Sequence, residues 1–162
     1  MLSIRRAEAA DFAAIWPILQ AVFSRGDTYS FSPDMSREEC FHTWMEVPLV
    51  TYVAIEDERV VGTYFLKPNQ PGLGSHVANA GYAVSPQARG KGIGRTMGEH
   101  SLKVARTLGF KAMQYNFVVS TNETAVKLWE KCGFAIVGRL PKAFNHKEKG
   151  FVDAYVMYQW LD

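Results

Sequence analysis

The 162 residues are 48% apolar and 13% aromatic, enough hydrophobic material for one compact globular domain, and we expect residues 1–162 to form it. Eighteen Lys and Arg residues against sixteen Asp and Glu residues leave a formal net charge of +2. They form no basic stripe, which argues against a nucleic-acid or membrane-surface partner. No apolar run approaches the roughly 20 residues that span a bilayer, the chain opens without an apolar signal segment, and it has two cysteines, so we expect a cytoplasmic protein.

Hydrophobic periodicity predicts alternating strands and helices along the chain. In the first half of the chain, the pattern predicts a strand over 2–6, a helix over 10–23, a turn-rich loop over 25–34, a helix over 36–46 and a hairpin of strands 51–56 and 59–66. It then predicts a strand over 76–84, a helix over 92–108, a strand over 112–119 and a helix over 122–132. The last two strands, 135–139 and 152–161, are expected to flank a long charged loop, 141–150. This order predicts an α/β (α+β) fold with a mixed, mostly antiparallel sheet of about seven strands and about four helices.

Four residues add local detail to these elements. Asp11 is a candidate cap for the first helix, and Pro17 should delay its start or kink it because proline has no backbone N–H. Gly109 and Gly133, each followed by Phe, are expected to end the two later helices as C-caps.

The stretch from Val84 to Arg95 reads as a strand, a turn and a helix start suited to an anion. Glycines stand at alternate positions 90, 92 and 94, where the missing Cβ lets backbone N–H groups approach a ligand closely. Arg89, Lys91 and Arg95 add positive charge to the helix N-terminus. This combination predicts a binding site for the pyrophosphate of a nucleotide-like cofactor.

Spacing separates three glycine-rich sites that could look like this one. A Walker P-loop fails because the position that requires its first glycine is Ser85 and because Gly92 follows Lys91. A dinucleotide site fails because the acidic residue expected roughly 20 positions further on would fall near Gln114 or Asn116. The remaining pattern is Arg/Gln-x-x-Gly-x-Gly/Ala, which residues 89–94 match.

A second pattern follows in Asn122-x-x-Ala125-x-x-Leu128-Trp129-x-Lys131-x-Gly133-Phe134. With these two motifs the chain resembles the GCN5-related N-acetyltransferases, and the resemblance implies acetyl-CoA as cofactor. The backbone N–H groups of residues 90–95 would hold the pyrophosphate, Tyr82 to Val84 would pair with pantetheine, for which Gly81 would leave room or form a bulge, and Asn122 would reach CoA besides capping its helix. The implied cofactor residues are Tyr82, Ala83, Val84, Arg89, Gly90, Lys91, Gly92, Ile93, Gly94, Arg95, Asn122 and Trp129.

Trp129 departs from the family pattern. The family usually has a Tyr there, which protonates the departing thiolate, whereas an indole N–H donates a hydrogen bond but cannot act as that acid. Tyr115, Tyr155 or water would replace it, or the thiolate would leave unassisted. Core packing of Trp129 is an equally good interpretation.

Asn79 and Asn116 fall on the two strands expected to flank the cofactor. Together with Asn122 and the motif Trp, they are similar in type and spacing to fungal N-acetyltransferases that act on proline analogues such as azetidine-2-carboxylate. By that resemblance, Asn79 recognises the substrate and Asn116 holds the amine or a water that takes its proton, so we list both as catalytic candidates. Tyr29 and Phe31, in the loop that covers the acceptor site in the family, either face the substrate or pack the loop down.

We therefore predict an acetyl-CoA-dependent N-acetyltransferase acting on a small amine or imino acid by direct attack in a ternary complex. Two alternatives remain open, acetylation of protein N-terminal amines and a catalytically silent acyl-CoA-binding module. The four histidines have no metal-ligand spacing, so no metal is implied. Homodimer formation, frequent among related domains, is a further expectation.

Overall fold

The computed structural model describes residues 1–162, and its strands and helices follow the predicted order. In chain order the elements are β1 (Ser3–Arg6), η1 (Ala9–Asp11), α1 (Phe12–Ser24), α2 (Arg37–Phe41), η2 (His42–Glu46), β2 (Val50–Glu56), β3 (Arg59–Pro68), η3 (Gly72–Gly74), β4 (Val77–Val84), η4 (Pro86–Ala88), α3 (Ile93–Thr107), β5 (Ala112–Val119), α4 (Glu123–Lys131), β6 (Ala135–His146) and β7 (Gly150–Trp160). Seven strands and four α-helices confirm the predicted fold class.

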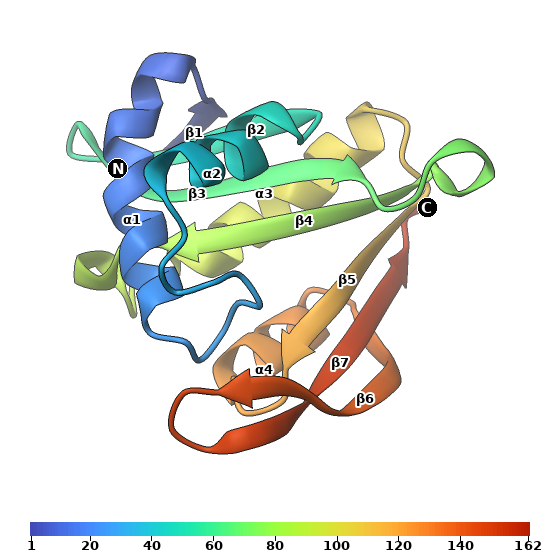
Figure 1. Ribbon diagram of the computed structural model, residues 1–162. Coiled ribbons are helices and arrows are strands. Elements are labelled where there is room, and N and C mark those ends of the chain that lie inside the picture. Colours follow the sequence, from blue (N-terminus) through green and yellow to red (C-terminus); the bar gives the residue numbers. More distant parts are fainter.

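The strands form one mixed sheet in the order β1-β2-β3-β4-β5-β7-β6. Every neighbouring pair is antiparallel except β4 and β5, which run parallel. Those two strands pair only at Val77 with Ala112 and at Ala78 with Met113. Beyond these pairs they diverge, and the sheet opens into two halves (Figure 1).

A separate hydrophobic core covers each face of the sheet. On one face α1 and η2 bury Phe12, Leu19 and Trp44 against β2 to β4. On the other face α3 and α4 bury Met97 and Trp129. Both cores extend to the point where β4 and β5 separate, so side chains from either face can reach the opening.

Glycine C-caps end both helices of the second core, as predicted. Gly109 and Gly133 adopt left-handed backbone conformations, with φ of +90° and +100°. The N–H of the Phe that follows each glycine then reaches back to a helix carbonyl, Phe110 to Ala105 and Phe134 to Trp129, both at 3.0 Å. The caps direct each chain into the next strand.

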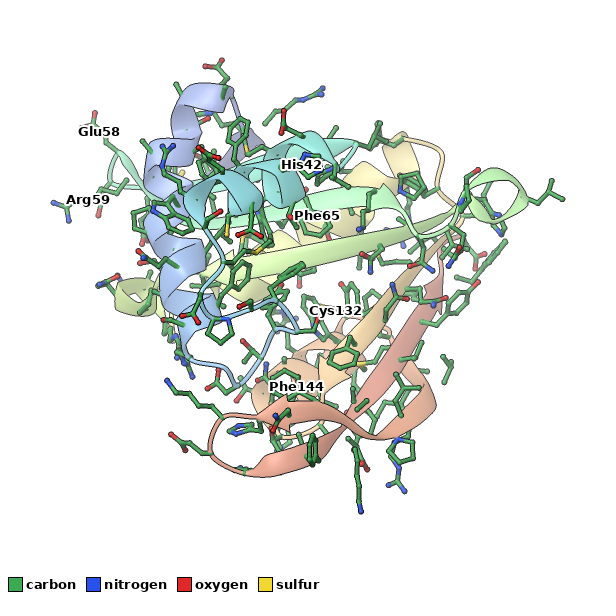
Figure 2. The ribbon with its side chains drawn as sticks, viewed as in Figure 1. His42, Glu58, Arg59, Phe65, Cys132 and Phe144 are labelled. Atoms are coloured by element: carbon green, nitrogen blue, oxygen red, sulfur yellow. The ribbon has the colours of Figure 1, made fainter.

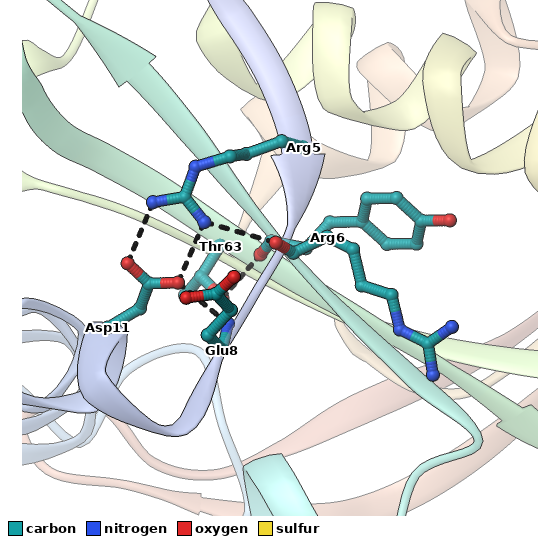
Figure 3. Close-up of polar contacts among 6 residues, drawn as sticks. Arg5, Arg6, Glu8, Asp11 and Thr63 are labelled. Atoms are coloured by element: carbon teal, nitrogen blue, oxygen red, sulfur yellow. Dashed lines mark hydrogen bonds and ion pairs between the residues drawn. The ribbon is translucent and has the colours of Figure 1, made fainter.

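An ion pair fixes the start of α1 against the first strand (Figure 3). Both guanidinium nitrogens of Arg5 donate to the Asp11 carboxylate at 2.8 Å, and the backbone N–H of Glu8 donates to the same carboxylate at 2.7 Å. The Arg5 hydrogen bonds are the main cause that lowers the pKa of Asp11 below its ordinary value. Asp11 therefore stands at the N-cap position of α1, but its side chain makes no capping hydrogen bond to that helix and accepts instead from the N–H at the start of η1.

Two expectations were wrong. The late start expected for the first helix was wrong, because α1 begins at Phe12 and Pro17 lies inside it. Residues 13 and 17 are both exposed, so water can solvate the Ala13 carbonyl that proline leaves without a partner. Residues 141–150 are no long loop, because β6 continues to His146 and only residues 147–149 turn into β7. Phe144 and His146 are buried at alternate positions, a strand pattern that the lysines on either side of them obscure.

Candidate functional site

A cleft of about 360 Å³ opens where β4 and β5 diverge. Its walls come from β3, β4, β5, α4 and the loop 25–34. It brings together seven predicted site residues: Tyr29, Phe31, Asn79, Tyr82, Asn116, Asn122 and Trp129. The other predicted residues lie outside its lining: Ala83 and Val84 are the last two residues of β4, and residues 89–95 follow between β4 and α3 and in its first turn.

A second cavity of about 220 Å³ shares part of the cleft wall. Tyr29, Ser30, Phe31 and Phe117 line both spaces. The second cavity continues to Phe144 on β6, whereas the first reaches Phe65 on β3, and Figure 2 shows these two rings on the two halves of the opened sheet. The four shared residues therefore form a mostly aromatic partition between two spaces.

The glycine turn before α3 has the backbone geometry of an anion cradle. Gly90 and Gly92 have φ of +77° and +76°, and a Cβ added at either would meet no atom within 4 Å. Gly92 is the N-cap of α3 and offers no side chain to the first-turn N–H groups, which have no partner within the helix. Open space, left-handed glycines and free N–H donors fit a pyrophosphate.

The cations beside this turn are only partly available. Lys91 lies 3.8 Å from Glu56, and Arg95 lies 2.9 Å from Glu99, both as exposed ion pairs. Exposed pairs of this kind are weak, so an incoming phosphate can compete for either cation.

The hydroxyl of Tyr29 hydrogen-bonds with both backbone groups of Tyr82 on the cleft side of β4. It donates to the Tyr82 carbonyl at 2.5 Å and accepts from the Tyr82 N–H at 2.6 Å. Burial raises the pKa of Tyr29, so the hydroxyl stays protonated and makes both bonds. These are among the groups that family resemblance assigns to pantetheine. The ring also stacks on Phe31 and packs on Phe23, so Tyr29 both lines the cleft and holds the loop down.

Gly81 lines the cleft and also accommodates a side chain of the neighbouring strand. The pairing of β3 with β4 continues unbroken through Gly81, so there is no bulge at this position. A Cβ there would lie 2.5 Å from the Phe65 ring, which shows that the glycine makes room for that side chain. The irregularity is instead on β5, between Tyr115 and Val118, where Asn116 and Phe117 interrupt the pairing with β7.

Three buried hydroxyls form a chain whose proton direction is fixed. Ser101 donates to the Gly98 carbonyl at 2.6 Å, so its oxygen must accept from Tyr82 at 2.6 Å. Tyr82 must then accept from Tyr115 at 2.9 Å. Burial raises the pKa of Tyr82 to about 12 and that of Tyr115 well above its ordinary value. Of the two tyrosines expected to replace the missing acid, Tyr115 donates its proton to Tyr82, and Tyr155 does not line the cleft.

Trp129 packs as a wall between the second core and the cleft. Its ring lies 4.7 Å from those of both Tyr82 and Tyr115, and the side chain is 8% exposed. Gly98 makes this position possible, because a Cβ there would come within 2.8 Å of the indole. The two interpretations of Trp129, packing and cleft lining, are therefore compatible.

Hydrogen bonds of amide side chains link β4, β5 and the residue after β3. Asn79 on β4 donates to the backbone carbonyl of Gln114 at 2.9 Å. The Gln114 side chain donates to Asn116 at 2.9 Å, and Asn116 donates to Asn69 at 2.7 Å. The two predicted asparagines share the cleft but do not bond to each other. Lys67, which also lines the cleft, was missed because a lysine near a strand end looks like an ordinary surface residue.

Asn122 combines its two expected positions. It is the N-cap of α4, accepting from the Ala125 N–H at 3.4 Å, and it lines the cleft. No group of three or more His, Cys, Asp or Glu side chains is placed to hold a metal ion.

Comparison with known proteins identifies this arrangement. The model of the acetyltransferase (GNAT) family matches residues 12–134. The chain belongs to the GNAT family. It is 34% identical over 152 residues to the N-acetyltransferase aca1 of Schizosaccharomyces pombe, covering 83% of this chain and 72% of that protein. None of the helices of this GNAT acetyltransferase has the length and apolar character that a membrane crossing requires.

Solved GNAT structures share this fold. A GCN5-related N-acetyltransferase from Kribbella flavida superimposes with a TM-score of 0.94 at 41% identity, covering 99% of this chain and 98% of that one. A phosphinothricin acetyltransferase from Sinorhizobium meliloti, solved in complex with acetyl-CoA, has a TM-score of 0.87 at 22% identity, covering 99% of this chain and 88% of that one. In this GNAT enzyme, the cradle at Gly90 and Gly92 leaves open space for the pyrophosphate of such a cofactor.

Proposed function

We propose that this GNAT acetyltransferase moves the acetyl group of acetyl-CoA to the nitrogen of a small amine or imino acid by direct attack in a ternary complex. The observation that carries the proposal is the cleft between β4 and β5, where Asn79 and Asn116 meet an aromatic wall from the loop 25–34. No cysteine or histidine lines this cleft, which favours direct transfer over an acylated enzyme.

The chain's backbone would bind the cofactor. The N–H groups of residues 90–95 would hold the pyrophosphate, and Tyr82, Ala83 and Val84 would pair with pantetheine as an added strand. Bound acetyl-CoA supplies an activated thioester. Because Tyr29 occupies both backbone groups of Tyr82, its hydroxyl must leave before pantetheine can pair there.

The acceptor would lie on the other side of the reacting carbonyl. Asn79 would recognise it, and Asn116 would orient the amine or a water that takes its proton. Neither amide is a base, so the nitrogen must reach the thioester already neutral. Trp129 forms a wall but provides no acid, and the Tyr115 proton is committed to Tyr82, so the thiolate leaves without a protein acid.

Release of free CoA thiol from acetyl-CoA across a panel of amines tests this function. The panel comprises azetidine-2-carboxylate, proline, other amino acids, polyamines, aminoglycosides and short N-terminal peptides. Turnover with small amines or imino acids supports the proposal. Turnover confined to peptides would reassign the acceptor to protein N-termini, and acetyl-CoA binding without turnover would leave a silent binding module.

A further inference from the structure

The cleft contains one charged side chain. Among its 18 lining residues, Lys67 is the only Lys, Arg, His, Asp or Glu. None of the six ion pairs in the structure involves Lys67. Its ammonium group instead lies 5.7 Å from the centre of the Phe65 ring, which is also part of the cleft wall. A half-buried cation without a counterion faces the space that the acceptor must enter.

The sheet register places Lys67 at the acceptor end of the cleft. Lys67 lies opposite Asn79, and Tyr64 lies opposite Tyr82. Three residues of strand separate these pairs, which is about 10 Å. The glycine turn follows the other end of β4, so Tyr82 lies between Lys67 and the proposed pyrophosphate site. Lys67 is therefore not placed to bind the cofactor phosphates.

We propose that Lys67 is a specificity-determining residue that binds the carboxylate of the acceptor, which makes the acceptor an amino or imino acid. This inference rests on the proposed function. A lysine ammonium forms a charge-assisted hydrogen bond with a carboxylate, and the neighbouring amides of Asn79 and Asn116 offer further donors. Because no carboxylate lines the cleft, polycations such as polyamines and aminoglycosides meet repulsion from Lys67 without a compensating partner.

The test compares an acid with its amide in two enzymes. Thiol release is measured for L-proline and azetidine-2-carboxylate, and for their carboxamides, with the wild type and with Lys67→Met, which keeps the length of the side chain but removes the charge. For the acids, we expect KM to rise about 10- to 100-fold with kcat little changed. For the amides, KM should stay the same, so each substrate is its own reference.

Two controls separate specificity from folding. Lys103→Met removes an exposed cation on α3 and should leave every KM unchanged. The affinity of Lys67→Met for acetyl-CoA should equal that of the wild type, and Lys67→Arg should restore part of the affinity for the acids.

The outcomes distinguish this inference from the proposed function. Equal loss for acids and amides, or no loss for either, would overturn the assignment of Lys67. Wild-type turnover that favours amines without a carboxylate would also overturn it, while acetyl transfer to a small amine would stand. Absence of turnover with every small amine would overturn both.

Discussion

The bond from Tyr29 to the backbone of Tyr82 predicts an unusual effect of Tyr29→Phe: the variant should be less stable alone but bind acetyl-CoA more tightly. Without the hydroxyl, the Tyr82 N–H and carbonyl both lose a partner in the unbound protein. Since the cleft admits water, we expect the free energy of unfolding to fall by about 1–2 kcal/mol. For a chain of this size, that lowers the melting temperature by about 2–8 °C.

The gain in affinity follows from a thermodynamic cycle. If pantetheine replaces the Tyr29 hydroxyl, the bound state does not depend on that hydroxyl, so the unbound state alone is destabilised. An increase of about 1–2 kcal/mol in binding free energy corresponds to roughly 5- to 30-fold tighter binding. Isothermal titration with acetyl-CoA gives the affinity, and urea unfolding gives the stability.

Tyr155→Phe is the matched control, because Tyr155 lies outside the cleft and should change neither affinity nor stability by a comparable amount. Unchanged or weaker binding by Tyr29→Phe would refute the reasoning, since it would mean that Tyr29 stays on Tyr82 when the cofactor is bound.

Three further predictions concern the glycine turn and pH. Gly92→Val should weaken acetyl-CoA binding, because it places a side chain in the open cradle. Its control is Gly109→Val, also at a left-handed position with open space: both variants should lose about 1–2 kcal/mol in free energy of unfolding, but only Gly92→Val should lose affinity. Equal affinities of the two variants in titration would contradict the cradle. Because no carboxylate or imidazole lines the cleft, log kcat/KM should rise with a slope of about one up to the amine's own pKa, and a plateau between pH 6 and 7 would reveal a protein base. Unfolded tyrosines ionise near pH 10, whereas folding raises the pKa of Tyr82 to about 12, so the free energy of unfolding should fall as pH rises from about 10 through 12. Thermal melts at pH 8 and pH 11 measure this loss, and equal melting midpoints would contradict it.

The sequence predicted features that local backbone chemistry decides. Gly90 and Gly92 were identifiable because the left-handed turn strongly favours glycine, and their conformations agree. Gly109 and Gly133 were identifiable for the same reason. The order of strands and helices followed from apolar periodicity, which strong packing on both faces of the sheet reinforced.

Contacts between distant residues lay beyond that reasoning. Nothing near Tyr29 indicates a bond to a backbone 53 positions away. The bulge expected at Gly81 is absent, and the side chain that Gly81 accommodates belongs to the neighbouring strand. Lys67 becomes informative only when the fold shows that its surroundings contain no acid. In each case, the role of the residue depends on a neighbour that only the tertiary structure brings close to it.

The divergence of β4 and β5 has a consequence for self-association. Beyond their two shared residue pairs, both strands turn a backbone edge toward the cleft, and an unpaired edge is a template for a strand of another chain. The loop 25–34 lines that opening, and the Tyr29 hydroxyl satisfies the β4 edge at Tyr82. The loop therefore shields an internal edge from foreign strands until the cofactor arrives, and shortening it should produce aggregation as well as slower turnover.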